Sequence, residues 1–250
     1  VRGLLAILAE DLAERLDFTR AQPVPSALFP PDLYRQESDV VWRVPYRDGA
    51  QGEVWVVLLV EHQSEPDRRM GLRLLCYMVH LWSAERRRLE ESGVPLSQWA
   101  LPPIVPILLY TGSAPWHGPI GVGTVMQLPR ELERFVPAHD VLWLNVKGEP
   151  AERLTAAGHP MGWLLRAMRE EEGPKESLKT ALQGAMRFME GLAEEQRAQW
   201  LQAAHFLLLL IYHRRPEAER AELTEALVQA VDKQRLKEEV SAMSKTAAEV

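Results

Sequence analysis

Cysteine is almost missing from this sequence, because Cys76 is the only one among 250 residues. A single thiol cannot form an intrachain disulfide, which excludes a disulfide-stabilised scaffold and suits a reducing compartment. Long hydrophobic runs are missing as well: the longest candidate, 206–212, is far shorter than the roughly 18 apolar residues of a membrane span. No charged and then apolar leader precedes a small-residue cleavage site. These absences predict a cytoplasmic protein without a membrane segment.

Excess positive charge is the next absence. The sequence has 29 Lys and Arg against 35 Asp and Glu, for a formal net charge of −6. This balance does not by itself indicate a nucleic-acid-binding protein, but binding depends on local charge. Arginine is clustered at 35–47, 68–73 and 86–88; such clusters are most often solvated helix faces. Hydrophobic residues at 46% and charged residues at 26% are ordinary for a globular protein and exclude wholesale disorder.

The first part of the sequence mixes helical and strand-like patterns. Apolar residues recur at helical spacing over 4–16, whereas 39–46 alternates as a half-buried strand does. An Asp-Gly pair supplies turn chemistry, and the valine-rich run 53–60 reads as a strand covered on both faces. The expected elements are a helix at 4–16, strands at 39–46 and 53–60 joined by a hairpin turn at 47–52, a helix at 67–91, and strands at 104–110 and 141–145.

Beyond residue 148 the composition changes to Ala, Leu, Glu, Arg and Gln, punctuated by Gly and Pro. We expect helices at 152–172, 175–193, 195–214 and from 216 to the end. The sequence therefore predicts an α/β core at 1–147 followed by an α-helical region at 148–250. An imperfect apolar stripe in the last helix could pack on the body of the protein or on a second copy, so a homo-oligomer formed through the C-terminal helices stays open.

The predicted hairpin brings two acidic side chains together. With its turn centred at Ala50, facing positions sum to about 100, so Asp39 faces Glu61 and Glu37 faces Gln63, within a residue or two. Glu61 and Gln63 share one face of their strand, and facing Cβ atoms lie roughly 5 Å apart.

Two carboxylates this close repel each other, and a bound divalent cation would relieve the repulsion. Oxygen ligands suit Mg²⁺ or Mn²⁺ better than zinc. The alternative on geometry alone is that these acids are simply solvated at strand ends.

The segment from RQESDVVWRVPYRDG (35–49) through EHQSEPD (61–67) and RLLCY (73–77) to LPPIVPILLYTG (101–112) resembles the Rpn/YhgA-like family. This family comprises recombination-promoting nucleases, often labelled putative transposases, within the PD-(D/E)XK nuclease superfamily. The resemblance covers roughly residues 15–147. It implies a restriction-endonuclease-like core, with a mixed central sheet flanked by helices, and a metal-dependent endonuclease that acts on DNA.

By this resemblance Asp39 occupies the first acidic position, Glu61 the second, and Gln63 the position of the family's lysine. Asp39 and Glu61 would hold Mg²⁺, which Mn²⁺ can replace, and Gln63 would orient the attacking water. A neutral amide cannot accept a proton or supply the positive charge of lysine.

The helix that follows supplies further candidates. Arg73 and Tyr77 are four residues apart and share a helix face; the RLxxY motif implies that this face borders the active site. Arg73 would bind a phosphate bidentately, while Tyr77 would contact a ligand carboxylate or DNA, or is an ordinary core aromatic. Glu37 would join the cation or pair with Arg35. Arg68 and Arg69 would neutralise backbone phosphates without reading sequence.

The sequence thus predicts a Mg²⁺-dependent DNA endonuclease of low sequence specificity, linked by resemblance to recombination or mobile elements. Two alternatives stay open: a homologue that keeps the fold but has lost cleavage, and a non-enzymatic adaptor that self-associates through its C-terminal helices.

Overall fold

The computed structural model describes residues 1–24, 40–49, 52–61, 66–116, 120–193 and 196–247. The chain divides into two compact units, Val1–Asn145 and Val146–Val250. Within the described residues no helix combines the length and the apolarity that crossing a membrane requires.

The first unit is built on one mixed sheet. Its described strands follow the order β1-β2-β3-β4-β5, in which β1, β2 and β3 are antiparallel neighbours and β3, β4 and β5 are parallel neighbours. The strands are β1 (Gln22–Pro23), β2 (Val40–Pro45), β3 (Glu53–Glu61), β4 (Ile104–Tyr110) and β5 (Leu142–Asn145).

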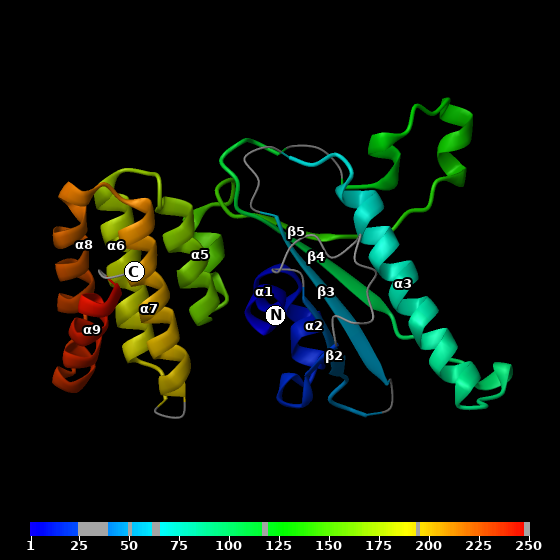
Figure 1. Ribbon diagram of the computed structural model, residues 1–250, viewed down its shortest axis with the longest axis horizontal. Coiled ribbons are helices and arrows are strands. Elements are labelled where there is room, and N and C mark those ends of the chain that lie inside the picture. The colour runs from blue at the N-terminus through cyan, green and yellow to red at the C-terminus, as the bar shows by residue number, and fades with distance from the viewer. Residues whose placement is uncertain (25–39, 50–51, 62–65, 117–119, 194–195, 248–250) are drawn as a thin grey trace. The chain divides into compact units, whose positions relative to one another are not determined.

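Helices flank this sheet, with α3 on one side and α1 and α2 on the other (Figure 1). The long helix α3 is the crossover that a parallel β3–β4 pair requires. The helical segments of this unit are α1 (Arg2–Leu8), α2 (Glu10–Arg15) and α3 (Met70–Glu91), with 3₁₀ turns η1 (Phe18–Arg20), η3 (Leu96–Gln98), η4 (Val122–Val125) and η5 (Arg130–Phe135). The predicted α/β class, with a mixed central sheet flanked by helices as in restriction-endonuclease-like cores, is confirmed.

The core between α3 and the sheet follows from the two periodicities. Leu74, Tyr77 and Leu81 recur every three or four residues of α3 and are at most 1% exposed, so they form one helix face. They pack in a single cluster with Trp55 of β3 and Leu108 of β4. This face of α3 therefore packs against the sheet and forms one part of the core of the first unit.

The hairpin register differs from the predicted one by two positions. Paired residues of β2 and β3 sum to 98, as in Val40 with Leu58 and Val44 with Val54. The turn is therefore centred at Gly49, one residue before the predicted Ala50. Gly49 has φ +67° and Gly52 has φ +78°, a backbone conformation that glycine adopts without the steric cost of a side chain.

The second unit is helical throughout its described part. Its core is apolar and includes five fully buried side chains: Leu182, Met186, Leu207, Leu208 and Leu227. Its helices are α4 (Ala151–Ala156), α5 (Pro160–Glu170), α6 (Lys175–Glu190), α7 (Arg197–Arg214), α8 (Glu217–Gln229) and α9 (Gln234–Ala247). The helical C-terminal region is thereby confirmed.

Three helices that the sequence predicted as single are each divided in two. The predicted helix at 4–16 breaks at Ala9, which has φ −155°. The helix at 152–172 breaks at Gly158, where φ is +58°, before Pro160 starts α5 at its first turn. The helix from 216 onward breaks between α8 and α9, where Glu190 accepts hydrogen bonds from the backbone N–H groups of Asp232 and Lys233.

Candidate active site at the carboxyl edge of the sheet

The parallel strands β3, β4 and β5 end in one row. Glu61 pairs in register with Tyr110, and Tyr110 pairs with Asn145. In open α/β sheets ligands bind beyond the carboxyl ends of the strands. This row is therefore the edge of the sheet where a site is expected. Asn145, a polar residue that ends an apolar strand, belongs to this row and was not predicted from the sequence as a site residue.

The turn that precedes α3 is organised around Asp67. Its carboxylate accepts the backbone N–H of Arg69 at 2.8 Å and both Nε (3.0 Å) and an Nη (3.1 Å) of the Arg69 side chain. These hydrogen bonds hold the pKa of Asp67 below its ordinary value. The N–H groups of Arg69 that bind Asp67 are thus already used within the turn. This lowers the capacity of Arg69 to bind a phosphate, the role that the sequence predicted for it.

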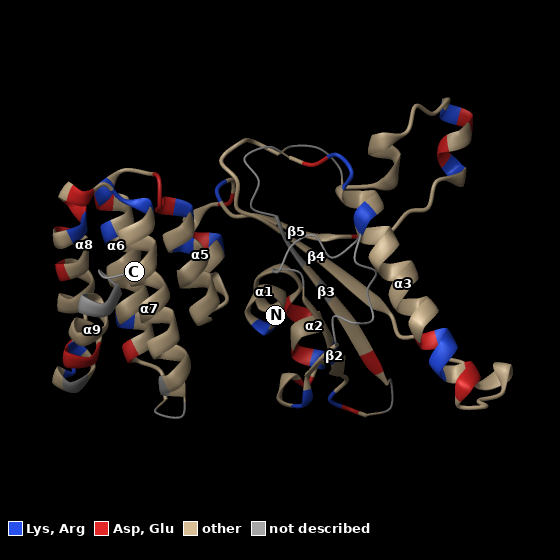
Figure 2. Ribbon diagram, in the orientation of Figure 1, with Lys and Arg blue, Asp and Glu red and all other residues tan. Residues whose placement is uncertain are grey.

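Arg68 contacts a different segment. One of its Nη atoms donates to the carbonyl of Thr124 at 2.8 Å, while the Thr124 hydroxyl donates to the carbonyl of Arg68 at 2.7 Å. This reciprocal pair joins the start of α3 to η4. Figure 2 shows that basic residues occur near both ends of α3, with an uncharged stretch between them.

Arg73 and Tyr77 lie side by side on α3. The guanidinium carbon of Arg73 is 6.0 Å from the centroid of the Tyr77 ring, within the range of a cation–π contact. Tyr77 is 1% exposed, so its ring belongs to the core, whereas Arg73 is half-buried. The predicted shared face is present, and the roles predicted for the two residues in catalysis stay predictions.

The predicted metal ligands lie at the border of what the structure describes. Glu61 is the last residue of β3, described here by its backbone. Glu37, Asp39 and Gln63 lie outside the described residues. Over the described ranges no group of three or more His, Cys, Asp or Glu side chains is arranged to hold a metal ion. The convergence of Asp39, Glu61 and Gln63 stays a prediction.

An aromatic cluster stands at the end of β4. The Tyr110 and Trp116 rings meet edge to face, with centroids 5.0 Å apart, and Trp116 meets Trp143 of β5 at 5.9 Å. The Tyr110 hydroxyl donates to the carbonyl of Ala114 at 2.9 Å, which shapes the turn that leads to Trp116. The proline and glycine of this turn, followed by a tryptophan, are visible in the sequence and indicate a turn. The residues against which the tryptophan packs could not be predicted from them, because Trp143 is distant along the chain.

Comparisons with known proteins identify the family of this chain. Residues 2–170 match the family described as "Putative transposase, YhgA-like". Over 112 residues the chain is 31% identical to the recombination-promoting nuclease RpnD of Escherichia coli O157:H7. The aligned part makes up 44% of this chain and 39% of RpnD, so the chain spans about two fifths of the length of this relative. No solved structure gives a significant match. The family match covers most of the chain and includes the whole sheet, α3 and the edge described above, and the chain therefore belongs to the YhgA-like transposase family.

Proposed function

We propose that this chain is a Mg²⁺-dependent DNA endonuclease that hydrolyses phosphodiester bonds with low sequence specificity, in the context of recombination or mobile elements. Membership of the YhgA-like family and similarity to a protein named as a recombination-promoting nuclease support the nuclease class. The observation that carries the proposal is the position of Glu61: it ends β3 at the carboxyl edge of the parallel strands, six residues before Asp67 and the turn that leads into α3.

The donor set fits a hard divalent cation. Asp39 and Glu61 offer carboxylate oxygens, and Gln63 offers an amide oxygen. The E-x-Q motif contains no cysteine, and its middle residue, His62, is its one histidine. All-oxygen donors suit Mg²⁺ or Mn²⁺ rather than zinc. When bound, such an ion would polarise the scissile phosphate and lower the pKa of a coordinated water.

The protein's own residues would then divide the remaining work. Gln63 would orient the attacking water through its amide, without accepting its proton. Arg73, half-buried beside the Tyr77 ring, would donate to a phosphate oxygen. Arg68 and Arg69 lie in the turn before α3, and the guanidinium of each donates a hydrogen bond within the protein. These two residues would contribute positive charge more than direct contact. Such backbone contacts carry no sequence information.

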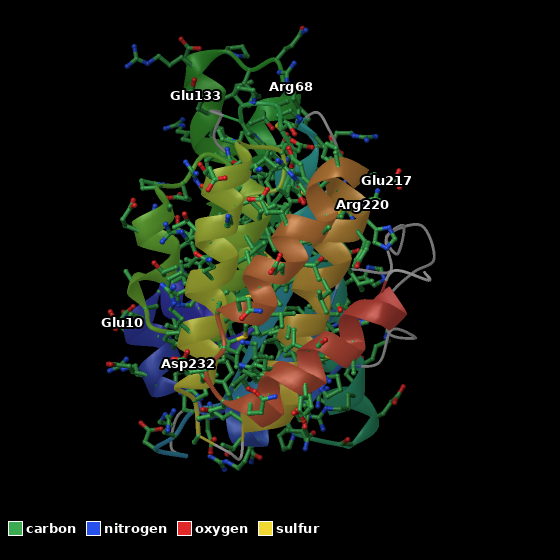
Figure 3. All side chains as sticks on the ribbon, turned by 90° about the vertical axis from the view of Figure 1, so that its left-hand side faces the viewer. Glu10, Arg68, Glu133, Glu217, Arg220 and Asp232 are labelled. Carbon is green, nitrogen blue, oxygen red and sulfur yellow. The ribbon has the colours of Figure 1, made fainter. Side chains whose placement is uncertain are left out.

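Nicking of supercoiled plasmid tests the proposal. The unmodified protein should nick DNA with Mg²⁺ and not with EDTA, and Asp39→Ala and Glu61→Ala should each abolish nicking. Glu37→Ala, in parallel, shows whether the third acid takes part. Glu133→Ala is the matched control, because Glu133 is an exposed acid on η5 at the periphery of the first unit (Figure 3), and it should nick as the unmodified protein does.

The other outcomes separate the alternatives. Binding of DNA without nicking, with either Mg²⁺ or Mn²⁺, would indicate a homologue that has lost cleavage. Neither binding nor nicking, together with a stable oligomer that truncation near Gly173 dissolves, would indicate an adaptor. Gln63→Lys should retain or raise activity, because lysine restores the charge usual in the family; complete loss would contradict the water-orienting role of Gln63.

A further inference from the structure

A small pocket opens between the first turn of α3 and the segment that leads into η4. Its volume is about 250 Å³, below the roughly 300–1,000 Å³ of pockets for drug-sized ligands. At about 30 Å³ per water, this is the volume of about eight water molecules. That number is close to the number of non-hydrogen atoms in one nucleobase. Its lining divides into three apolar and three polar side chains: Met70, Trp116 and Ile120, and Asp67, Arg68 and Thr124.

The pocket is held open by close packing of its two walls. Gly71 on α3 faces the backbone of Gly121 so closely that a Cβ on residue 71 would lie 2.6 Å from the Gly121 carbonyl oxygen. The reciprocal hydrogen bonds between Arg68 and Thr124 join the same two segments. The walls are therefore positioned before any ligand arrives, which reduces the entropy lost on binding.

The chemistry of the lining is that of a site for a flat ring with a polar edge. Trp116 is kept in place by edge-to-face contacts with Tyr110 and Trp143; it is 7% exposed, and it lines the pocket with part of its indole. Asp67 is an acceptor whose orientation is fixed by Arg69, and Arg68 retains N–H donors beyond the one given to Thr124. A nucleobase presents both donors and acceptors at its edge and an apolar face.

The position of the pocket connects it to the proposed cleavage site. Asp67 is six residues after Glu61 in the chain, and Trp116 packs against Tyr110, the register partner of Glu61. The pocket and the carboxyl edge are thus joined through the contact of Trp116 with Tyr110, so we expect a nucleotide whose phosphate lies at this edge to place its base in the pocket.

We infer that this pocket binds one unstacked nucleobase next to the phosphate that is cut, and that the preferred substrate therefore contains an unpaired nucleotide. The inference rests on the proposed function, since it takes nucleic acid as the ligand. A base inside a duplex can enter the pocket only if it leaves the stack of bases. Unstacking and unpairing cost free energy, and this cost is smaller for a base that is already unpaired.

Binding to two matched oligonucleotides tests this inference. Both are DNA duplexes with one bulged position; one carries a base there and the other an abasic nucleotide, so that the distortion of the backbone is kept and only the base is removed. With EDTA present to prevent metal-dependent cleavage, fluorescence anisotropy should show at least about fivefold tighter binding of the duplex that carries the base, the lower bound for stacking of one base on an aromatic side chain.

Two variants connect the difference to the pocket. Ile120→Trp fills the pocket and should reduce the affinity ratio to about one. Val79→Trp adds the same side chain on the exposed face of α3, where Val79 is 50% exposed, and should keep the ratio. In the unmodified chain, 5-iodouracil at the bulge should photo-crosslink to the pocket residues, Trp116 in particular, when the adducts are mapped by mass spectrometry; this arm does not depend on the folding of a variant.

The possible failures are distinguishable. If neither duplex binds and plasmid is not nicked, the proposed function itself is wrong. If plasmid is nicked but the two duplexes bind equally, or a folded Ile120→Trp protein keeps the full ratio, or the crosslinks map away from the pocket, the inference alone is overturned.

Discussion

The arginines around the start of α3 show that contacts, more than residue type, determine what a charge can do. Arg69 is tied to Asp67, and Arg68 is tied to the carbonyl of Thr124. Arg73 is half-buried next to the ring of Tyr77, and its charge helps to lower the pKa of Asp67. From the sequence, Arg73 was expected to bind a phosphate directly and Arg68 and Arg69 to supply charge. The hydrogen bonds that Arg68 and Arg69 make within the protein are compatible with that division, and the phosphate contact of Arg73 stays a prediction.

Replacing Arg73 should change the salt dependence of DNA binding. Each phosphate contact that is lost reduces the slope of log affinity against log salt by about 0.9, so Arg73→Gln should lower it by about one and weaken binding to all sequences alike. Arg86→Gln is the control, because Arg86 lies on the same helix and pairs with Glu90 at 2.7 Å. Equal slopes for Arg73→Gln and the unmodified protein would remove Arg73 from the interface.

A second ionisable residue gives a pH-dependent contribution to stability. Lys175 and Lys179 of α6 donate to Glu222 of α8, at 2.5 and 2.9 Å, and hold the pKa of Glu222 at about 2 against an ordinary value of 4.5. Because the folded-state pKa is the lower one, this contribution is complete above about pH 4.5 and is lost as pH falls towards 2.

The stability difference between the unmodified protein and Glu222→Gln should follow this curve. Urea unfolding should show the variant to be less stable at pH 7 and the difference to shrink between pH 4.5 and 2. Glu225→Gln changes an exposed acid on the same helix and should show little difference at any pH. A difference for Glu222→Gln that is independent of pH would contradict the ion-pair explanation.

At the scale of elements, glycine determines how closely a helix approaches its neighbour. Gly162 of α5 lies against the carbonyl oxygen of Leu154 in α4, and Gly71 of α3 lies against Gly121. A side chain at either position would overlap backbone atoms, which cannot rotate away. These two contacts set the spacing of α4 to α5 and of α3 to the segment before η4.

Adding one methyl group at Gly71 should therefore destabilise the first unit. Gly71→Ala places a Cβ 2.6 Å from the Gly121 oxygen, and overpacking of this kind costs about 1–3 kcal/mol. Gly123→Ala adds the same group where nothing lies within 4 Å, and it should be close to neutral. Thermal unfolding of the two variants makes the comparison; equal melting temperatures would show that α3 and this segment do not pack as described.

At the scale of the whole molecule, two large clusters of buried apolar side chains stand out among the described residues. One lies between α3 and the sheet, and the other lies among α5–α9. The family match ends at residue 170, so it covers α4 and α5 of the second unit, while α6–α9 lie beyond it. The family segment and the compact units thus have different boundaries.

A unit with its own core should fold by itself. We expect residues 146–250, expressed alone, to be helical by circular dichroism and to unfold cooperatively in urea, because this segment buries its apolar residues internally. The fragment 171–250 lacks α4 and α5 and should unfold at lower urea concentration. Gradual, non-cooperative unfolding of 146–250 would show that its stability depends on the first unit.

The sequence alone determined the elements whose signal is local. The alternation around β2, the apolar run of β3, and the spacing of Leu74, Tyr77 and Leu81 depend on residues within one or two turns or strand lengths, and each led to the correct type of element. The family resemblance, confirmed by the match over residues 2–170, also depended only on short segments of sequence between residues 35 and 112.

The three-dimensional structure decided both the local backbone geometry that no periodicity encodes and the contacts between residues distant in the chain. The helix breaks at Ala9 and Gly158, the two-position shift of the hairpin, and the fork from Arg69 to Asp67 are set by local backbone conformation and by contacts that no periodicity encodes. The pocket beside Trp116 exists because Gly71 meets Gly121, fifty residues later. Close packing between segments far apart in the chain has no signature in either one alone, and for that reason the elements could be predicted from the sequence while the shape of the site could not.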